Sequence, residues 1–110
     1  MKKSLWITIG IIIIVILFAV IMRSSIHNGV SSEVTKCIGE NSILYTQLGC
    51  HACKNQEKLF GENSQNLNIV DCFYEREKCA EIQYTPTWII NGEKYTGVQS
   101  VEKLKELTGC

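Results

Sequence analysis

The sequence has little proline and no excess of positive charge. Its 110 residues include one proline, and its eleven basic side chains are balanced by eleven acidic ones. Three of the basic residues precede residue 24, so residues 24–110 carry a net charge of −3. Binding to nucleic acid requires a basic surface, so this charge balance argues against a nucleic-acid partner. The short chain, without internal repeats after residue 40, predicts one small domain and argues against a large multidomain enzyme.

One long run contains no charged residue. Residues 5–22 are uncharged and almost entirely apolar, with two lysines before them and Arg23 after them. An 18-residue helix is about 27 Å long, close to the roughly 30 Å of a bilayer core. We therefore expect residues 1–23 to form a single-pass transmembrane signal anchor. The larger positive charge before the run predicts a cytoplasmic N-terminus and an extracytoplasmic domain at the cell membrane.

A cleavable signal peptide is the alternative interpretation of the same run. Such peptides usually have a shorter apolar core and a cleavage site of small residues, and residues 21–25 offer no good site. Both interpretations place the remaining chain outside the cytoplasm. Disulfide bonds form and persist there, and all six cysteines follow the run.

The segment after the apolar run is polar and rich in small residues. Residues 24–40 show no sustained hydrophobic period, so we interpret them as a flexible extracytoplasmic tether that contains Cys37. The predicted domain covers residues 41–110. Its thin core of about 70 residues would gain stability from a structural disulfide.

Strand and helix signals alternate along this domain. We predict strands over 42–46, 67–72, 87–90 and 93–96, and helices over 50–61, 75–83 and 100–108. The helix over 75–83 is expected to bury Cys79, Ala80 and Ile82. The Asn91-Gly92 pair predicts a hairpin between the last two strands. The order β-α-β-α-β-β-α and the right-handed crossover rule predict an α/β fold, with a mixed four-stranded sheet and helices on both faces.

Cys50 and Cys53 form a Cys-X-X-Cys motif directly after a predicted strand, at the first turn of a helix. This arrangement is typical of a redox-active dithiol. The unpaired amide groups and the positive end of the helix dipole stabilise the Cys50 thiolate. We expect Cys50 to be the catalytic nucleophile and Cys53 to be the catalytic thiol that resolves the mixed disulfide. His51 either adds to this effect when protonated or is an exposed side chain without a role.

A zinc site and an inert disulfide are the alternatives for this pair. Zinc would need two more ligands, and the six residues between Cys72 and Cys79 exceed the usual spacing of a zinc knuckle, so we expect no metal. A disulfide across a two-residue loop adds little chain-entropy stabilisation. The redox interpretation is therefore favoured over both.

The other four cysteines leave several pairings open. Cys72 and Cys79 lie close enough in sequence to form either a structural disulfide or a second redox pair that exchanges with the first. Cys37 and Cys110 flank the domain, and they can pair with each other, stay free or bridge to another chain.

Pro86 directly precedes a predicted strand, where a trans proline would be awkward. It is either a simple turn residue or part of a substrate groove. If the Thr85-Pro86 bond is cis, this backbone segment can lie beside Cys50 and pair with an extended substrate chain.

The strand, the Cys-X-X-Cys helix start and the Thr-Pro ahead of a hairpin together resemble the thioredoxin fold in its minimal form. More narrowly, the motifs over residues 43–109 resemble the thioredoxin-like domain that is fused to, or works beside, vitamin K epoxide reductase homologues. These motifs include Cys-His-Ala-Cys at 50–53, Thr-Pro-Thr-Trp-Ile-Ile-Asn-Gly at 85–92 and Tyr-Thr-Gly-Val-Gln-Ser at 95–100.

This resemblance implies a partner in disulfide formation. In that family the dithiol oxidises folding proteins and is reoxidised by a four-helix membrane reductase that passes electrons to a quinone. By position, Cys50 and Cys53 match the nucleophile and the resolving thiol, Pro86 matches the cis-proline, and Cys72 with Cys79 matches a second cysteine pair. Two features depart from the pattern, because Cys-His-Ala-Cys replaces Cys-Pro-His-Cys and the quinone-reducing helices are absent. A separate reductase protein would have to supply them.

The expected function is a membrane-anchored thiol–disulfide oxidoreductase without a cofactor of its own. Its substrates would be thiols and disulfides of extracytoplasmic proteins, and a vitamin K epoxide reductase-like membrane protein would recycle it. Two alternatives remain open at this stage. One is a disulfide reductase or isomerase, since related dithiols span about −270 to about −120 mV. The other is a non-catalytic module that binds a metal or acts as a chaperone.

Overall fold

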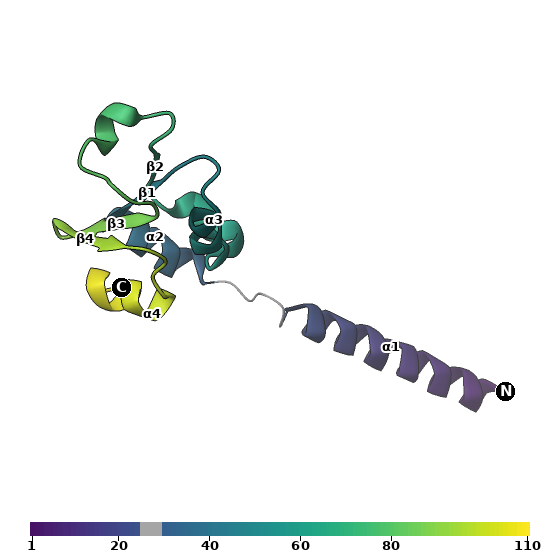
Figure 1. The fold of residues 1–110 in the computed structure, drawn as a ribbon. Helices are drawn as coiled ribbons and strands as arrows, with labels where there is room; N and C mark the ends of the chain where they lie inside the picture. Colours follow the sequence, from purple (N-terminus) through teal and green to yellow (C-terminus); the bar gives the residue numbers. More distant parts are fainter. Residues whose placement is uncertain (25–29) are drawn as a thin grey trace.

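The computed structural model describes residues 1–24 and 30–110 (Figure 1). The apolar run forms one helix, α1 (Lys2–Ser24). Within Lys2–Arg23 an 18-residue window has a mean hydropathy of 3.1, and the helix is long and apolar enough to cross a membrane. A helix satisfies its own backbone polar groups, which is the requirement for any segment within lipid. Residues 25–29, part of the predicted tether, lie outside the described residues.

A second helix, α2 (Ser32–Glu40), corrects the prediction that residues 24–40 form a flexible tether. The Ser31 hydroxyl accepts a hydrogen bond from the Val34 amide and so caps the helix N-terminus. Ile38 is fully buried against the rest of the domain. Gly39 lies directly against the backbone of Asn66, where a Cβ atom would clash. The helix therefore exists because its inner face packs on the domain.

Four strands form one mixed sheet in the order β2-β1-β3-β4. Their bounds are β1 (Ser42–Thr46), β2 (Ile69–Asp71), β3 (Thr87–Ile90) and β4 (Glu93–Thr96). The strands β1 and β2 are parallel, whereas β3 is antiparallel to both β1 and β4. The predicted mixed sheet and hairpin are thus confirmed. Asn91 and Gly92 both have positive φ at the hairpin turn, as a two-residue turn of this kind requires.

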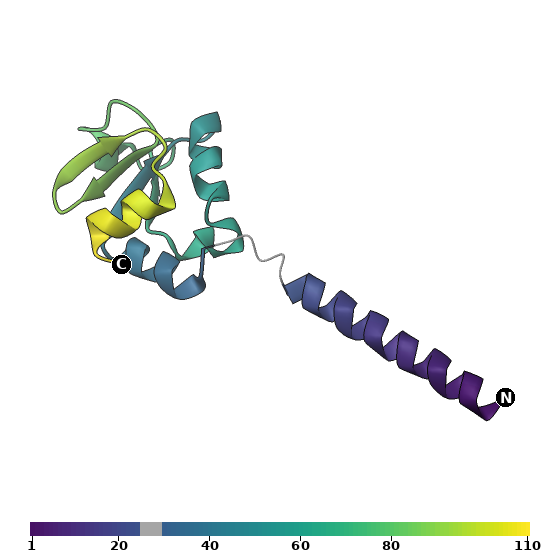
Figure 2. The ribbon, with the colours of Figure 1, turned by 90° about the horizontal axis from the view of Figure 1, so that it is seen from below.

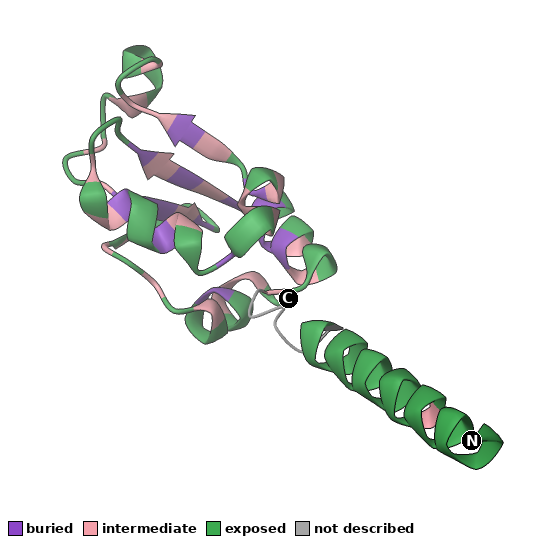
Figure 3. Ribbon diagram, turned by 90° about the vertical axis from the view of Figure 1, so that its right-hand side faces the viewer, coloured by how far each residue is buried: buried purple, intermediate pink, exposed green. Residues whose placement is uncertain are grey.

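One face of the sheet carries the hydrophobic core. Leu44, Trp88 and Ile90 point from the strands toward buried residues of the helical layer, namely Ile38, Phe60, Leu67 and Leu104. The helices α2, α3 (His51–Lys58) and α4 (Val101–Thr108) all lie on this side of the sheet (Figures 1 and 2). Figure 3 shows the buried residues on the strands and on these helices, whereas α1 is exposed over nearly its whole length.

The opposite face of the sheet is covered by an irregular connection. Residues 77–82 lie over the side chains of Tyr45 and Ile89 and leave an open cavity of about 460 Å³ between them. The predicted arrangement with helices on both faces is therefore wrong among the described residues. The three α-helices that follow α1 share one face.

The predicted helix over 75–83 is also wrong. The structure has only a single 3-10 turn, η2 (Arg76–Cys79), because Cys79 forms a disulfide with Cys72 that closes a tight loop. Ala80 is exposed, and Cys79 and Ile82 are only half-buried, so the segment has no buried helical face. The exposed ion pair between Glu75 and Lys78, 2.7 Å apart, raises the pKa of Lys78 through its hydrogen bond.

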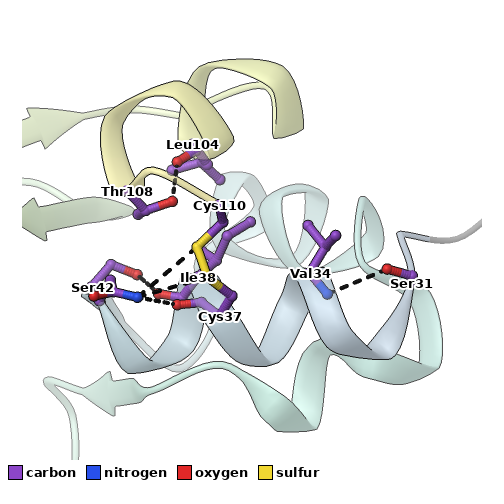
Figure 4. Close-up of a disulfide and its surroundings, with 9 residues drawn as sticks. Ser31, Val34, Cys37, Ile38, Ser42, Leu104, Thr108 and Cys110 are labelled. Carbon is purple, nitrogen blue, oxygen red and sulfur yellow. Dashed lines mark hydrogen bonds between the residues drawn. A yellow bond between two sulfur atoms is a disulfide. The ribbon is translucent and has the colours of Figure 1, made fainter.

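Cys37 and Cys110 pair with each other, which is one of the alternatives left open by the sequence. The disulfide joins α2 to Cys110, the second residue after the C-terminal end of α4 (Figure 4). Asn41 packs beside it, and its amide donates a 2.8 Å hydrogen bond to the Cys37 carbonyl. The cross-link spans a sequence separation of 73 residues. A loop of that size corresponds to about 4 kcal/mol in the chain-entropy model.

Candidate active site

The candidate site lies where β1 ends and α3 begins. The turn between them is closed by a 3.0 Å hydrogen bond from the Cys50 amide to the Gln47 carbonyl. Gly49 has a φ of 84°, a conformation that is costly for any residue with a Cβ atom. Cys50 follows with extended backbone angles and is the N-cap residue of α3. The turn therefore places the first cysteine at the exposed N-terminus of the helix.

Cys50 and Cys53 form a disulfide, with Cα atoms 5.3 Å apart. The two sulfur-bearing residues differ in exposure, because Cys50 is half-buried whereas Cys53 is 3% exposed. An external thiol can therefore approach Cys50 more readily than Cys53. The order of attack, with Cys50 as the nucleophile, stays a prediction.

Two donors converge on the sulfur of Cys50. The Cys53 amide donates a 3.2 Å hydrogen bond to Cys50 Sγ, and the Thr85 hydroxyl donates a second one at 3.6 Å. Sulfur carries a full negative charge only in the thiolate that forms when the disulfide is reduced. Both donors, together with the helix dipole, stabilise that charged form.

Thr85 and Pro86 come from a segment 35 residues further along the chain, yet they lie at the cysteine pair. Cys50 Sγ is 3.7 Å from the Thr85 carbonyl oxygen. The peptide bond between Thr85 and Pro86 is cis, and Pro86 is fully buried. Its carbonyl accepts a 2.8 Å hydrogen bond from the Gly97 amide, which fixes the segment after β4 beside it. The structure thus brings Cys50, Cys53, Thr85 and Pro86 together.

His51 is the first residue of α3, and its side chain is exposed. Within the described part of the chain, its imidazole makes no hydrogen bond or ion pair. The structure therefore places His51 next to Cys50 in sequence without a hydrogen bond to the sulfur.

Cys72 and Cys79 form a separate disulfide directly after β2, with Cα atoms 5.7 Å apart. The Cys72 amide donates a 2.8 Å hydrogen bond to the Thr46 carbonyl at the end of β1. The second pair therefore lies, like the first, beyond the C-terminal ends of the parallel strands β1 and β2. All six cysteines are in disulfides, and no group of three metal-ligating side chains occurs among the described residues.

Two residues that were not predicted as site residues contribute to this site. One is Asp71, whose Oδ1 atom accepts hydrogen bonds from the amides of Leu48 at 3.2 Å and Phe73 at 2.9 Å. It links the turn before Cys50 to the loop closed by the second disulfide. The other is Gln56, which lies in the predicted helix over 50–61. Its side chain is fully buried and hydrogen-bonded behind the cysteine pair.

Apolar side chains are exposed around the cysteine pair. Leu48 is 56% exposed in the turn before Cys50, Tyr84 is 67% exposed beside Thr85, and Val98 is 47% exposed after Gly97. They come from three separate connections that meet at the site. Exposed apolar residues that gather in one region are typical of an interaction surface.

No protein-family model matches the chain. A curated relative does, and it is the thiol-disulfide oxidoreductase LTO1 of Arabidopsis thaliana. It is 36% identical over 83 residues, which cover 63% of this chain and 22% of the relative. The chain therefore spans about a fifth of the relative's length. This similarity supports a relationship to thiol oxidoreductases, and together with the Cys50–Cys53 pair it points to a redox enzyme.

Proposed function

We propose that this chain is a membrane-anchored thiol–disulfide oxidoreductase with a thioredoxin-like fold that introduces disulfides into exported proteins. The observation that carries the proposal is the environment of Cys50. Its half-buried sulfur receives hydrogen bonds from the Cys53 amide and the Thr85 hydroxyl, while Cys53 is covered. An oxidant needs a reduced form that is stabilised, and these donors stabilise it.

The reaction follows from the two sulfurs. A substrate thiolate attacks Cys50 Sγ, the Cys50–Cys53 bond breaks, and its electron pair leaves with Cys53 as a thiolate. A second substrate thiolate then attacks the substrate sulfur of the mixed disulfide and releases Cys50 as a thiolate. The substrate has lost two electrons and gained a disulfide. The chain has gained two electrons, and protonation completes its dithiol.

The substrate of this reaction is an extended, incompletely folded polypeptide. Leu48, Tyr84 and Val98 are exposed apolar residues on the connections that carry Cys50, Thr85 and Gly97, and a chain that has not yet buried its own apolar residues can bind to them. The Thr85 backbone beside Cys50 Sγ offers a polar group for pairing with an extended segment.

The membrane helix supports the proposed location and the proposed partner. With α1 as an anchor and the N-terminus in the cytoplasm, the domain lies on the extracytoplasmic side, where substrates acquire disulfides. Reoxidation requires an acceptor for two electrons. We assign this step to a separate membrane protein of the vitamin K epoxide reductase type, which an anchored domain would meet at the membrane surface.

The proposal is tested with the full chain in detergent and a reduced, unfolded ribonuclease as substrate. The oxidised chain should restore ribonuclease activity, and one chain dithiol should accumulate for each disulfide that forms in the ribonuclease. The Cys50→Ser variant should be inactive. A Cys37→Ser/Cys110→Ser variant, which removes another disulfide, is the matched control and should retain activity. Equal activity of the Cys50→Ser variant and the wild type would refute the proposal.

A further inference from the structure

Gln56 is a buried polar side chain that is hydrogen-bonded to Trp88 of the apolar core. It is 0% exposed, and its amide group makes three hydrogen bonds. The Oε1 atom accepts from Trp88 Nε1 at 3.0 Å and from the Gln99 amide at 2.6 Å, while Nε2 donates to the Gln99 carbonyl at 3.0 Å. A buried amide without partners would be costly, so this site requires all of its partners in place.

These bonds join the three segments that form the candidate active site. Gln56 lies on α3, three residues after Cys53, so it is nearly one helical turn behind the disulfide. Trp88 lies on β3, two residues after Pro86. Gln99 belongs to the connection in which the Gly97 amide donates to the Pro86 carbonyl. One side chain therefore connects the cysteine helix to both segments that hold Pro86.

We propose that Gln56 is a positioning residue that sets the distance between Cys50 Sγ and the Thr85 hydroxyl. The inference rests on the proposed function, because that hydroxyl matters only when Cys50 becomes a thiolate. Apolar packing alone lets a helix shift along a sheet, since contact between apolar surfaces is non-directional. Three hydrogen bonds of defined length and angle, made to two different segments, fix the helix in one position.

An apolar residue of similar shape separates this role from a merely structural one. The Gln56→Met variant fills nearly the same volume but makes none of the three hydrogen bonds. The helix is then free to move relative to Thr85, and the Cys50 thiolate loses part of its stabilisation. Less stabilisation of the thiolate shifts the equilibrium with glutathione toward the Cys50–Cys53 disulfide and moves the alkylation of Cys50 to higher pH.

The test uses the full chain in detergent and three measurements. These are the glutathione equilibrium of Cys50–Cys53, the pH profile of Cys50 alkylation in the reduced protein, and the stability toward denaturant. For Gln56→Met we expect an equilibrium constant for reduction about fivefold lower than that of the wild type, the factor typical of one lost hydrogen bond. The alkylation profile should shift to higher pH as well.

Leu104→Ala is the matched control, because Leu104 is equally buried on α4 and contributes only apolar contacts. It should lower stability and leave the equilibrium constant and the pH profile unchanged. The inference is overturned if Gln56→Met leaves both redox measurements at wild-type values, or if Leu104→Ala shifts them equally.

A second variant covers the case in which Gln56→Met does not fold. Trp88→Phe keeps an aromatic ring but removes the Nε1 donor to Gln56, and we expect a smaller shift in the same direction. An unchanged equilibrium constant in this variant would then refute the inference. The glutathione equilibrium needs no protein substrate, so the inference can be tested even if the wild type fails to oxidise ribonuclease. That failure would refute the proposed function alone.

Discussion

The Thr85 hydroxyl donates a 3.6 Å hydrogen bond to Cys50 Sγ across 35 residues of sequence. The contact joins the start of the cysteine helix α3 to the segment before β3, so the distance between the two atoms depends on the relative position of these two segments. It also gives the sulfur a neutral donor besides the Cys53 amide. The reactivity of Cys50 should therefore depend on a residue outside the Cys-X-X-Cys motif.

The Thr85→Val variant tests this dependence, because valine has the shape of threonine without the hydroxyl. We expect the equilibrium constant for reduction of Cys50–Cys53 to fall about fivefold. Thr96→Val on β4 is the matched control and should behave as the wild type. The measurement is redox equilibration with glutathione, followed by alkylation and mass analysis. No difference between the two variants would show that the hydroxyl does not stabilise the reduced form.

Cys53→Ser should trap the reaction halfway. Without the resolving thiol, Cys50 of this variant can form a mixed disulfide with a substrate that no internal sulfur breaks. We expect a covalent complex with a disulfide-containing protein substrate on a non-reducing gel, formed when the Cys50 thiolate attacks the substrate disulfide and displaces a substrate thiolate. The complex should disappear on reduction. Cys50→Ser should form far less of it, because Cys53 is 3% exposed. Equal trapping by both variants would contradict the assignment of Cys50 as the attacking residue.

Asp71 should control the turn before Cys50. The Asp71→Ala variant removes the acceptor of the Leu48 and Phe73 amides, so residues 47–49 lose a fixed position. We expect thiol–disulfide exchange at Cys50 to slow severalfold, as measured by stopped-flow mixing with a thiol substrate. Asp71→Asn keeps the Oδ1 acceptor and should stay close to the wild-type rate. Equal rates for Asp71→Ala and the wild type would exclude this role.

The Cys37–Cys110 disulfide should contribute stability rather than chemistry. Replacing both cysteines by serine should lower the free energy of unfolding by about 4 kcal/mol, measured from the denaturant midpoint. The redox equilibrium of Cys50–Cys53 should not change. Cys37 precedes the start of β1 and Cys50 follows its end, so the strand lies between the two disulfides along the chain. A changed equilibrium in the folded variant would assign this disulfide a part in the chemistry.

Local sequence signals predicted the parts of the fold that depend on neighbouring residues. Asn91-Gly92 predicts its hairpin because both residues adopt positive φ readily. The Cys-X-X-Cys motif lies at a helix start because Gly49 permits the turn before it. The helix α2 was missed because its stability comes from contacts of Ile38 and Gly39 with distant segments.

The rest of the site could not be predicted for the same reason. Nothing near Gln56 in sequence indicates that its partners are Trp88 and Gln99, 32 and 43 residues away. The 3-10 turn at 76–79 replaced a predicted helix because the disulfide from Cys72 to Cys79 determines that loop more strongly than its charge pattern. Contacts between residues distant in sequence decide the first outcome, and a disulfide whose pairing the sequence left open decides the second.

The central claim is that the Cys50–Cys53 pair acts as an oxidant. The measurement that tests it most directly is the reduction potential of this pair in the full chain in detergent, obtained by equilibration with glutathione and mass mapping of each cysteine. We predict a value near or above about −200 mV, in the range of dithiols that form disulfides. A value near about −270 mV, typical of a reductant, would contradict the account.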